Sequence, residues 1–260
     1  MDLNLTAKTA VVTGASRGIG LATVRTLTAE GVNVVGAART ITPELKETGA
    51  HTIAADLSTA EGVITLMDSA LIELGGIDLL VNNVGAGDDV EPLGFLDTDD
   101  PRWTRVFDLN LLSAVRTTRA ALPSLIERSG SIVNVSSINS RLPAAGPVAY
   151  SAAKAALTAL GKSLAEEFGP QGVRVNTVSP GVVRTSIWED PDGFGGKVAA
   201  GVGAEHAAFL QRIPEAFGIT TGRITEPEEV AALIVFLLSD VAGNITGTDH
   251  VIDGGTVKTL

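Results

Sequence analysis

"TGASRGIG", residues 13–20, decides how this chain folds. It ends a run rich in β-branched residues (6–15) and begins a helical pattern (18–32) that Gly31 closes just past its end. Glycines allow a tight turn here, and the amino terminus of the following helix presents free N–H groups and a positive dipole to a phosphate. The stretch therefore predicts a phosphate-binding loop for a dinucleotide, formed by Gly14, Ser16, Arg17, Gly18, Ile19 and Gly20.

The glycine spacing of this loop, Gly14-x3-Gly18-x-Gly20, differs from the usual G-x-G-x-x-G. Because the motif lies in the first strand–helix turn, we favour a phosphate-binding loop. The alternative is a glycine turn that only packs the strand on the helix. The same residues match G-x-S-x-G, the nucleophile elbow of serine hydrolases. That hydrolase interpretation is disfavoured because the motif sits on the first strand and no triad setting surrounds the histidines at 51, 206 and 250.

Strand and helix patterns alternate through the rest of the chain. Apolar strand-like runs occupy 33–39, 51–56, 77–83, 130–137, 173–180 and 248–255. Helical patterns occupy 59–75, 101–128 with a kink expected at Pro123, the segment from Tyr150 to about 168, and 227–240. Continuous apolar strands between helices are typical of a parallel sheet covered on both faces. We predict one α/β domain over residues 1–260: a Rossmann-type, doubly wound, mainly parallel seven-stranded sheet.

Composition excludes several classes of protein. The net charge of −11 argues against nucleic acid or an anionic membrane as a partner. The chain has no cysteine, so disulfides and thiolate metal sites are excluded. No apolar run approaches the roughly 18 residues that span a bilayer, and "MDLNLTAKTA" lacks a signal-peptide pattern. We expect a cytoplasmic protein with no metal site that acts on a small molecule.

The end of the second strand bears on which dinucleotide is bound. An acid there binds the ribose 2′-OH of NAD, but this chain has Ala37, Ala38 and Arg39. Arg39 and Arg17 are suited to a 2′-phosphate, which favours NADP(H) over NAD(H), unless both are simply solvated. After the third strand, Asp56 and Leu57 are expected to contact the adenine, and Asn82 and Gly85 of "NNVG" end the fourth strand at the same edge.

The only tyrosine of the chain, Tyr150, lies four residues before Lys154 in a helical segment. These positions share one helix face, and a nearby ammonium is expected to lower the pKa of a phenol. Ser137 ends the fifth strand, and Asn110 lies on the helix before it. Together the four residues predict an acid–base catalytic site at the carboxyl edge of the sheet.

Over residues 6 to about 255 the chain resembles the short-chain dehydrogenase/reductase family. The resemblance rests on "TGASRGIG", "NNVG", Asn110, "NVSS", "YSAAK", "VNTVSPGVVRT" and "ITGTDHVIDGG", in this order. One departure is Val84, where the family commonly has alanine. The resemblance implies that Tyr150 is the general acid in reduction and the base in oxidation, and that Ser137 binds the substrate oxygen.

It further implies that Lys154 lowers the pKa of Tyr150 and binds the nicotinamide ribose, while Asn110 holds a water for proton relay. Pro180, Gly181, Val183 and Thr185 are expected to surround the nicotinamide and its phosphate, with the Val183 backbone fixing the carboxamide. A homotetramer or homodimer is also implied. The alanines around Lys154 permit close helix approach, although alanine is also simply the best helix former.

Residues 181–225 break the alternation, because they show no strand and are rich in glycine and aromatic residues. Such a stretch is usually functional. We predict a mobile lid whose aromatic side chains contact an apolar or ring-containing ketone: Trp188, Phe194, Phe209 and Phe217. The predicted function is hydride transfer between NADP(H) and a carbonyl or secondary alcohol. A non-catalytic dinucleotide-binding sensor or scaffold, and an NAD-preferring alcohol dehydrogenase, are the alternatives.

Overall fold

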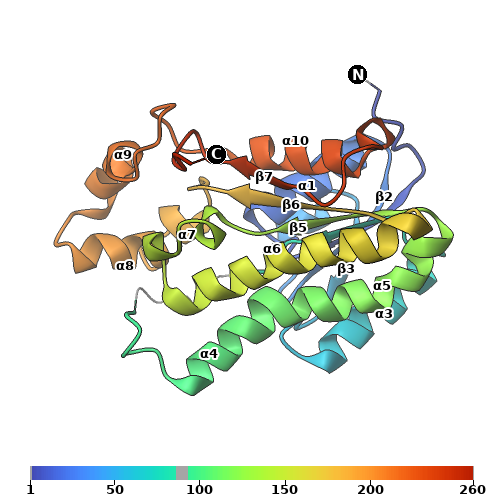
Figure 1. Ribbon diagram of the computed structural model, residues 1–260, viewed down its shortest axis with the longest axis horizontal. Helices are drawn as coiled ribbons and strands as arrows, with labels where there is room; N and C mark the ends of the chain where they lie inside the picture. Colours follow the sequence, from blue (N-terminus) through green and yellow to red (C-terminus); the bar gives the residue numbers. More distant parts are fainter. Residues whose placement is uncertain (1, 86–92, 260) are drawn as a thin grey trace.

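A seven-stranded parallel sheet forms the centre of the protein, of which the computed structural model describes residues 2–85 and 93–259 (Figure 1). Its order is β3-β2-β1-β4-β5-β6-β7, and every neighbouring pair is parallel. Each strand lies within its predicted range, so the predicted fold is confirmed. The strands are β1 (Thr9–Thr13), β2 (Asn33–Ala38), β3 (His51–Ala54), β4 (Leu79–Asn82), β5 (Ser131–Val135), β6 (Arg174–Pro180) and β7 (Asp249–Ile252).

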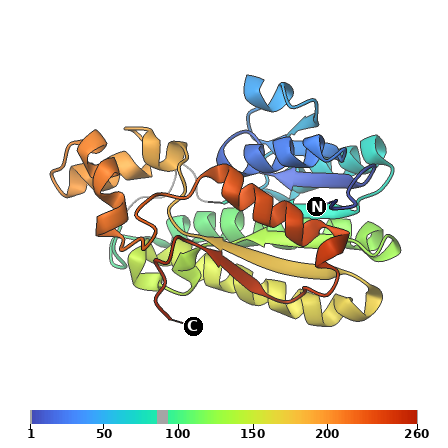
Figure 2. The same ribbon diagram turned by 90° about the horizontal axis from the view of Figure 1, so that it is seen from above.

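Helices cover both faces of the sheet (Figures 1 and 2). One face packs against α1 (Gly18–Ala29) and α10 (Pro227–Leu238). The other packs against α3 (Ala60–Leu74), α5 (Ser113–Glu127) and α6 (Val148–Phe168). A short helix that the sequence did not predict, α2 (Pro43–Lys46), follows β2.

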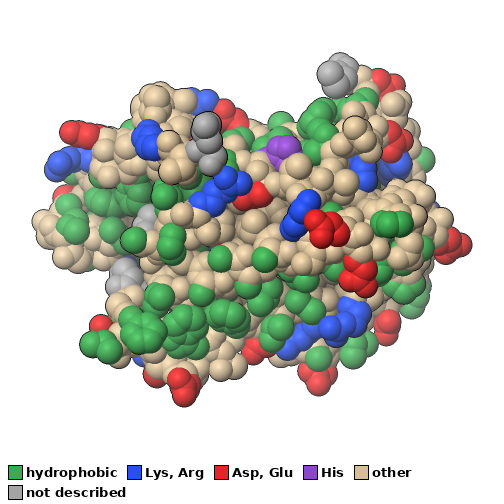
Figure 3. Space-filling model, in the orientation of Figure 1, with side chains coloured by type: hydrophobic (Ala, Val, Ile, Leu, Met, Phe, Trp, Pro, Cys, Tyr) green, Lys and Arg blue, Asp and Glu red, His purple; other side chains and the backbone are tan. Residues whose placement is uncertain are grey.

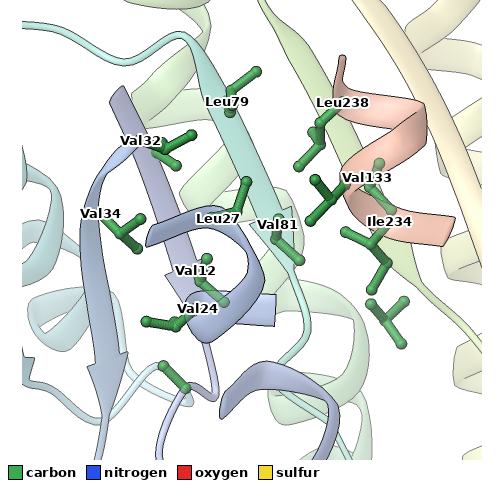
Figure 4. Close-up of a cluster of buried hydrophobic side chains, with 14 of the residues drawn as sticks. Val12, Val24, Leu27, Val32, Val34, Leu79, Val81, Val133, Ile234 and Leu238 are labelled. Carbon is green, nitrogen blue, oxygen red and sulfur yellow. The ribbon is translucent and has the colours of Figure 1, made fainter. Parts of the chain in front are cut away.

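The two hydrophobic cores lie on opposite faces of the same strands. Val12 of β1 packs with Leu27 of α1 and Ile234 of α10, all fully buried (Figure 4). The preceding residue, Val11, belongs to the opposite cluster with Leu66 of α3. Successive strand residues point to opposite faces, and here both faces are covered, which explains why the strands read as continuous apolar runs.

The predicted helix over 101–128 is interrupted, but not at Pro123. It divides into α4 (Asp100–Phe107), a π-helical turn over Asp108–Leu112, and α5, which contains Pro123. In the turn the Ser113 N–H bonds to the Asp108 carbonyl, five residues back. Such π-helical turns occur often at functional sites, and this one carries Asn110.

About half of residues 181–225, called the cap from here on, is helical, although the sequence pattern had predicted neither strand nor helix there. They form α7 (Ser186–Glu189), α8 (Phe194–Gly201) and α9 (His206–Ala216), which project beyond one end of the sheet (Figure 2). An isolated parallel bridge between Val183 and Thr225 joins the two ends of the segment. Its helices are short and glycine-containing, so their periodicity is hard to see in the sequence.

Within the described part of the chain, no helix combines the length and the apolarity needed to cross a membrane.

Candidate active site

A cavity of about 1180 Å³ lies at the carboxyl edge of the sheet. Its wall comes from the segments that follow β1 to β6, from the start of α6 and from the cap. In doubly wound sheets, ligands bind at this edge beside the point where the strand order reverses, which here is between β1 and β4.

The three glycines of the phosphate loop are each required for a different structural reason. Gly14 and Gly18 adopt φ angles of 65° and 54°, in the left-handed region that favours glycine. Gly20 lies under the loop, where a Cβ would collide with the Gly14 carbonyl. Arg17 is the N-cap of α1 and makes no side-chain capping bond. The first turn of α1 therefore reaches the cavity with N–H groups available to a phosphate.

Asn83 ties this loop to the end of β4. Its Nδ2 donates to the carbonyls of Thr13 at 3.0 Å and Gly14 at 3.1 Å, and its N–H donates to Thr13 Oγ1 at 2.9 Å. The residue predicted from the sequence was its neighbour, Asn82. Asn82 is buried away from the cavity and donates to Asn134 Oδ1 at 2.9 Å. The two neighbours differ because successive residues of an extended chain point in opposite directions.

The wall beyond β2 and β3 carries the predicted cations and acid. Arg17 and Arg39 both line the cavity, as do Asp56 and the buried Leu57. The Asp56 carboxylate accepts hydrogen bonds from the hydroxyl and the N–H of Ser58, at 2.8 and 3.0 Å. These bonds, with a smaller effect of the Arg39 charge, lower the pKa of Asp56. Asp56 therefore stays ionised as an acceptor.

Ser137, Tyr150 and Lys154 meet at the centre of the cavity wall. The Ser137 side chain is near enough to the Tyr150 phenol to favour its ionised form, which lowers the pKa of Tyr150 against the effect of burial. Lys154 is 2% exposed; its Nζ donates to the Val135 carbonyl at 2.8 Å and lies 5.7 Å from the centre of the Tyr150 ring. The turn after β5 and the start of α6 thus bring an acid, a hydrogen-bond donor and a cation together.

Asn110 approaches the same cluster from the π-helical turn. It is buried, and its Nδ2 donates to the Val106 carbonyl at 2.9 Å. A Cβ on Gly85 would lie 3.0 Å from Lys154 Nζ and 3.3 Å from Asn110 Oδ1. A side chain at position 85 would crowd these two polar atoms, so Gly85 helps to shape the site.

The pKa of Tyr150 is not lowered as the sequence analysis expected. Burial raises it, and the hydrogen bond with Ser137 only partly opposes that effect. Burial also lowers the pKa of Lys154 to about 8. The expectation considered the charge of the neighbour and left out desolvation, which disfavours the charged form of both groups.

The chain segment that follows β6 forms the far side of the cavity. Pro180, Gly181, Val183 and Thr185 all line it, as predicted. Ser186 also lines it, and its Oγ is buried without a hydrogen-bond partner in the described structure. A buried hydroxyl of this kind is normally satisfied, so Ser186 fits a polar group of a bound dinucleotide. No motif in the sequence had pointed to Ser186.

The aromatic side chains of the cap pack on one another. The Trp188 ring lies 5.4 Å from Phe194 and 5.6 Å from Phe217, both edge to face. These three line the cavity, whereas Phe209 does not and packs against the small cap core around Ile213. The cap aromatics therefore form one wall of the cavity while holding the cap together.

Among the described residues, no group of three or more His, Asp or Glu side chains is placed to hold a metal ion. The polar groups of the site instead match a dinucleotide: a helix amino terminus, two arginines and a buried hydroxyl.

A family model described as enoyl-(acyl carrier protein) reductase matches residues 14–257. The match runs from the phosphate loop past β7 and includes the Ser137, Tyr150 and Lys154 cluster. The chain belongs to the short-chain dehydrogenase/reductase family. It is an oxidoreductase of that family with a dinucleotide site and a small-molecule substrate.

Relatives in the short-chain dehydrogenase/reductase family cover nearly the whole chain. The 3β-hydroxysteroid dehydrogenase 1 of Eggerthella lenta is 35% identical over 97% of this chain and 94% of its own length. The 3-oxoacyl-[acyl-carrier-protein] reductase of Synechocystis is 37% identical, over 97% and 98%. The crystal structure of L-sorbose reductase from Gluconobacter frateurii, complexed with NADPH and L-sorbose, has a TM-score of 0.90 at 32% identity and covers both chains completely.

Most residues predicted from the family pattern line one cavity. Four do not: Gly20 and Asn110 lie behind the wall, Asn82 is in the interior, and Phe209 is in the cap core. Gly20 and Asn110 still shape the site through Gly14 and Gly85. Phe209 packs on the cap core that contains Val182 of the cavity wall, whereas the described contacts of Asn82 lead to Asn134 and Thr118 in the interior.

Proposed function

We propose that this protein reduces an apolar, ring-containing ketone with NADPH, and catalyses the reverse oxidation of the alcohol. The observation that supports the proposal most directly is the cluster of Ser137, Tyr150 and buried Lys154 in the wall of a cavity that also contains the phosphate loop. The cavity volume of about 1180 Å³ is large enough for a dinucleotide and a substrate together.

A bound nicotinamide supplies the hydride that reduces the carbonyl carbon. Tyr150 donates its phenolic proton to the carbonyl oxygen, so that C=O becomes CH–OH, and Ser137 donates a hydrogen bond to the same oxygen. The Lys154 ammonium stabilises the phenolate left behind and binds ribose hydroxyls. Asn110 holds a water that connects Lys154 with solvent. Acid–base assistance of this kind contributes roughly 10² to 10⁴-fold to the rate.

The preference for NADP(H) follows from Arg17 and Arg39. Both line the cavity, and β2 ends in Ala37 and Ala38, so no carboxylate at that position repels a 2′-phosphate. NADPH in the L-sorbose reductase structure supports this choice. Asp56 and Leu57 contact the adenine, while Pro180, Val183, Thr185 and Ser186 surround the nicotinamide end.

The ketone occupies the space between Tyr150 and the cap, against Trp188, Phe194 and Phe217, and the cap acts as a lid over it. Hydroxysteroid dehydrogenases and cis-4-hydroxycyclohexanecarboxylate dehydrogenase among the relatives are named for ring-containing substrates, which supports this class. Aromatic walls suit flat or alicyclic rings because they offer large, rigid apolar contact areas.

We further infer a cytoplasmic homotetramer or homodimer. No residue of α4 is buried in the single chain, and the neighbouring Phe95 and Leu96 are 68% and 94% exposed. Figure 3 shows apolar side chains gathered over α4. Such a patch on an otherwise acidic protein suits a second copy of the chain. Light scattering at micromolar concentration tests this inference, and a monomer contradicts it.

The central test compares the wild type with Tyr150→Phe. Nicotinamide absorbance is followed across a panel of ketones, and NADPH binding is measured by fluorescence. We expect Tyr150→Phe to bind NADPH normally and to lose about 100-fold or more in kcat/KM. Equal turnover by the variant refutes the assigned acid. NADPH binding without turnover of any ketone by the wild type favours a sensor or scaffold.

The cofactor preference has its own test in Arg39→Asp. A carboxylate at this position repels a 2′-phosphate and accepts from a ribose hydroxyl, so the ratio of kcat/KM for NADPH to that for NADH should fall. An unchanged ratio contradicts the role of Arg39 in recognising the 2′-phosphate.

A further inference from the structure

The substrate side of the cavity, as far as the described residues form it, is apolar and uncharged. Ile187, Val198 and Leu142 line it together with the cap aromatics, and no Lys, Arg, His, Asp or Glu belongs to this part of the described wall. The charged side chains of the described cavity are Arg17, Arg39, Asp56 and Lys154, all in the cofactor and catalytic part.

Asn139 stands out in this wall, two residues beyond Ser137. Its backbone N–H donates to Ser137 Oγ at 3.2 Å, so the residue is held directly beside the catalytic hydroxyl. Its side-chain Nδ2 lies against Gly146, where a Cβ on residue 146 would collide with it. The carboxamide therefore lies in the wall between Ser137 and the start of α6, in space that a glycine leaves open.

The Asn139 carboxamide makes no hydrogen bond to any described residue, although the backbone N–H of Asn139 is bonded. In the other carboxamide of the described cavity wall, Asn83, the amide nitrogen donates to the carbonyls of Thr13 and Gly14. Asn139 thus offers both a donor and an acceptor that the fold itself does not use. In an apolar wall beside the reacting atoms, such a group is placed to bind the substrate.

We propose that Asn139 is a specificity-determining residue, which hydrogen bonds to a second, neutral oxygen of the substrate. The substrate class that follows is a hydroxyketone or diketone on an otherwise apolar skeleton. The inference rests on the proposed ketone reduction and makes its substrate more specific.

A neutral second oxygen is favoured by the charges of the wall. A carboxylate here would lose its hydration without meeting a cation on the described substrate side, which contains none. A hydroxyl or keto oxygen instead replaces its water with one carboxamide hydrogen bond. A simple ketone leaves the amide to water or unpaired, so the expected preference for the second oxygen is about tenfold or more in kcat/KM.

The test uses cyclohexanone, its three positional hydroxy derivatives and 4-oxocyclohexanecarboxylate, all with saturating NADPH. The variants are Asn139→Leu, which keeps the side-chain size but removes both polar atoms, and Asn244→Leu, an exposed asparagine outside the cavity wall, as the matched control. The backbone bond to Ser137 Oγ does not depend on the side chain of residue 139, so Ser137 keeps this contact in the variant.

We expect the wild type and Asn244→Leu to prefer at least one hydroxyketone over cyclohexanone by about tenfold or more, and to use the carboxylate poorly. In Asn139→Leu this preference should fall toward unity. The proposal is overturned if the wild type shows no such preference, if Asn139→Leu keeps it, or if the carboxylate is the best of the five compounds.

Calorimetry of the NADP-saturated protein separates this proposal from the proposed function. Cyclohexanol is compared with the cyclohexanediols in the wild type and in Asn139→Leu. If no ketone is reduced, the proposed function fails, yet tighter diol binding that is lost in Asn139→Leu still supports the role of Asn139. Equal binding of the diols and cyclohexanol by the wild type overturns it.

Discussion

Replacing Lys154 by methionine should make the protein more stable at neutral pH while abolishing turnover. Lys154 is 2% exposed, and in the described structure no carboxylate forms an ion pair with it. Burial lowers its pKa from 10.5 to about 8. Its ammonium is therefore held in the fold against a desolvation penalty, and methionine keeps the apolar stem without the charge.

The size and the pH range of the effect follow from these two pKa values. The difference between 10.5 and about 8 corresponds to about 3 kcal/mol. The variant also loses the 2.8 Å hydrogen bond to the Val135 carbonyl, which costs about 1 kcal/mol. The free energy of unfolding at pH 7 should therefore rise by about 2 kcal/mol in net. Below pH 8 the lysine is protonated in both folded and unfolded chains, so the penalty is fully present.

Between pH 8 and 10.5 the folded chain releases the proton while the unfolded chain keeps it, so the penalty disappears as pH rises. Urea unfolding followed by circular dichroism at pH 7 and pH 10 measures this. The gain of Lys154→Met over the wild type should be largest at pH 7 and mostly gone at pH 10.

Lys162→Met is the matched control, because Lys162 lies on the same helix but is exposed and pairs with Glu166 on the surface. It should change the free energy of unfolding by less than about 1 kcal/mol. A Lys154→Met protein that is less stable than the wild type at pH 7, or whose difference from it is the same at both pH values, refutes the reasoning.

Three further predictions concern the fold and the pH profile. Arg174→Met should destabilise the protein by about 3 kcal/mol in urea unfolding, because the guanidinium donates to four carbonyls at and beyond the end of α10; a loss under 1 kcal/mol contradicts this. Gly20→Ala should weaken NADPH binding measured by fluorescence, since its Cβ collides with the loop backbone, whereas Gly169→Ala, with open space around it, should bind as the wild type does. Ketone reduction should be level below pH 8 and fall above it as Lys154 loses its proton, while Tyr150, whose pKa burial raises, remains protonated; a break below pH 7 argues against this assignment.

Local patterns were sufficient to predict the sheet and the centre of the site. Parallel strands buried on both faces give continuous apolar runs, and a Tyr–Lys pair four residues apart shares one helix face whatever surrounds it. Ser137 follows from the same logic, because the carboxyl ends of parallel strands meet at one edge. The apolar runs, the Tyr–Lys spacing and the position of Ser137 at a strand end are all local patterns, so they can be recognised in the sequence alone.

Features that depend on the environment in space were missed. The choice between Asn82 and Asn83 depends on where β4 ends, and the sequence does not fix that to one residue. The π-helical turn that places Asn110 has no residue signature comparable to a proline. The proposed roles of Ser186 and Asn139 could not be predicted from sequence, because they depend on polar atoms for which the described part of the fold shows no hydrogen-bond partner.

The unexpected pKa of Tyr150 is consistent with its proposed role. Burial makes the phenol a weaker acid, yet an alkoxide formed by hydride addition is far more basic than any phenolate, so the proton still moves to substrate. The phenolate then faces an ammonium whose pKa is about 8, below that of the phenol, so return of a proton from Lys154 to Tyr150 is favourable. A solvated lysine would hold its proton more tightly. In the proposed mechanism, the burial that destabilises the Lys154 ammonium therefore also favours return of a proton from Lys154 to Tyr150.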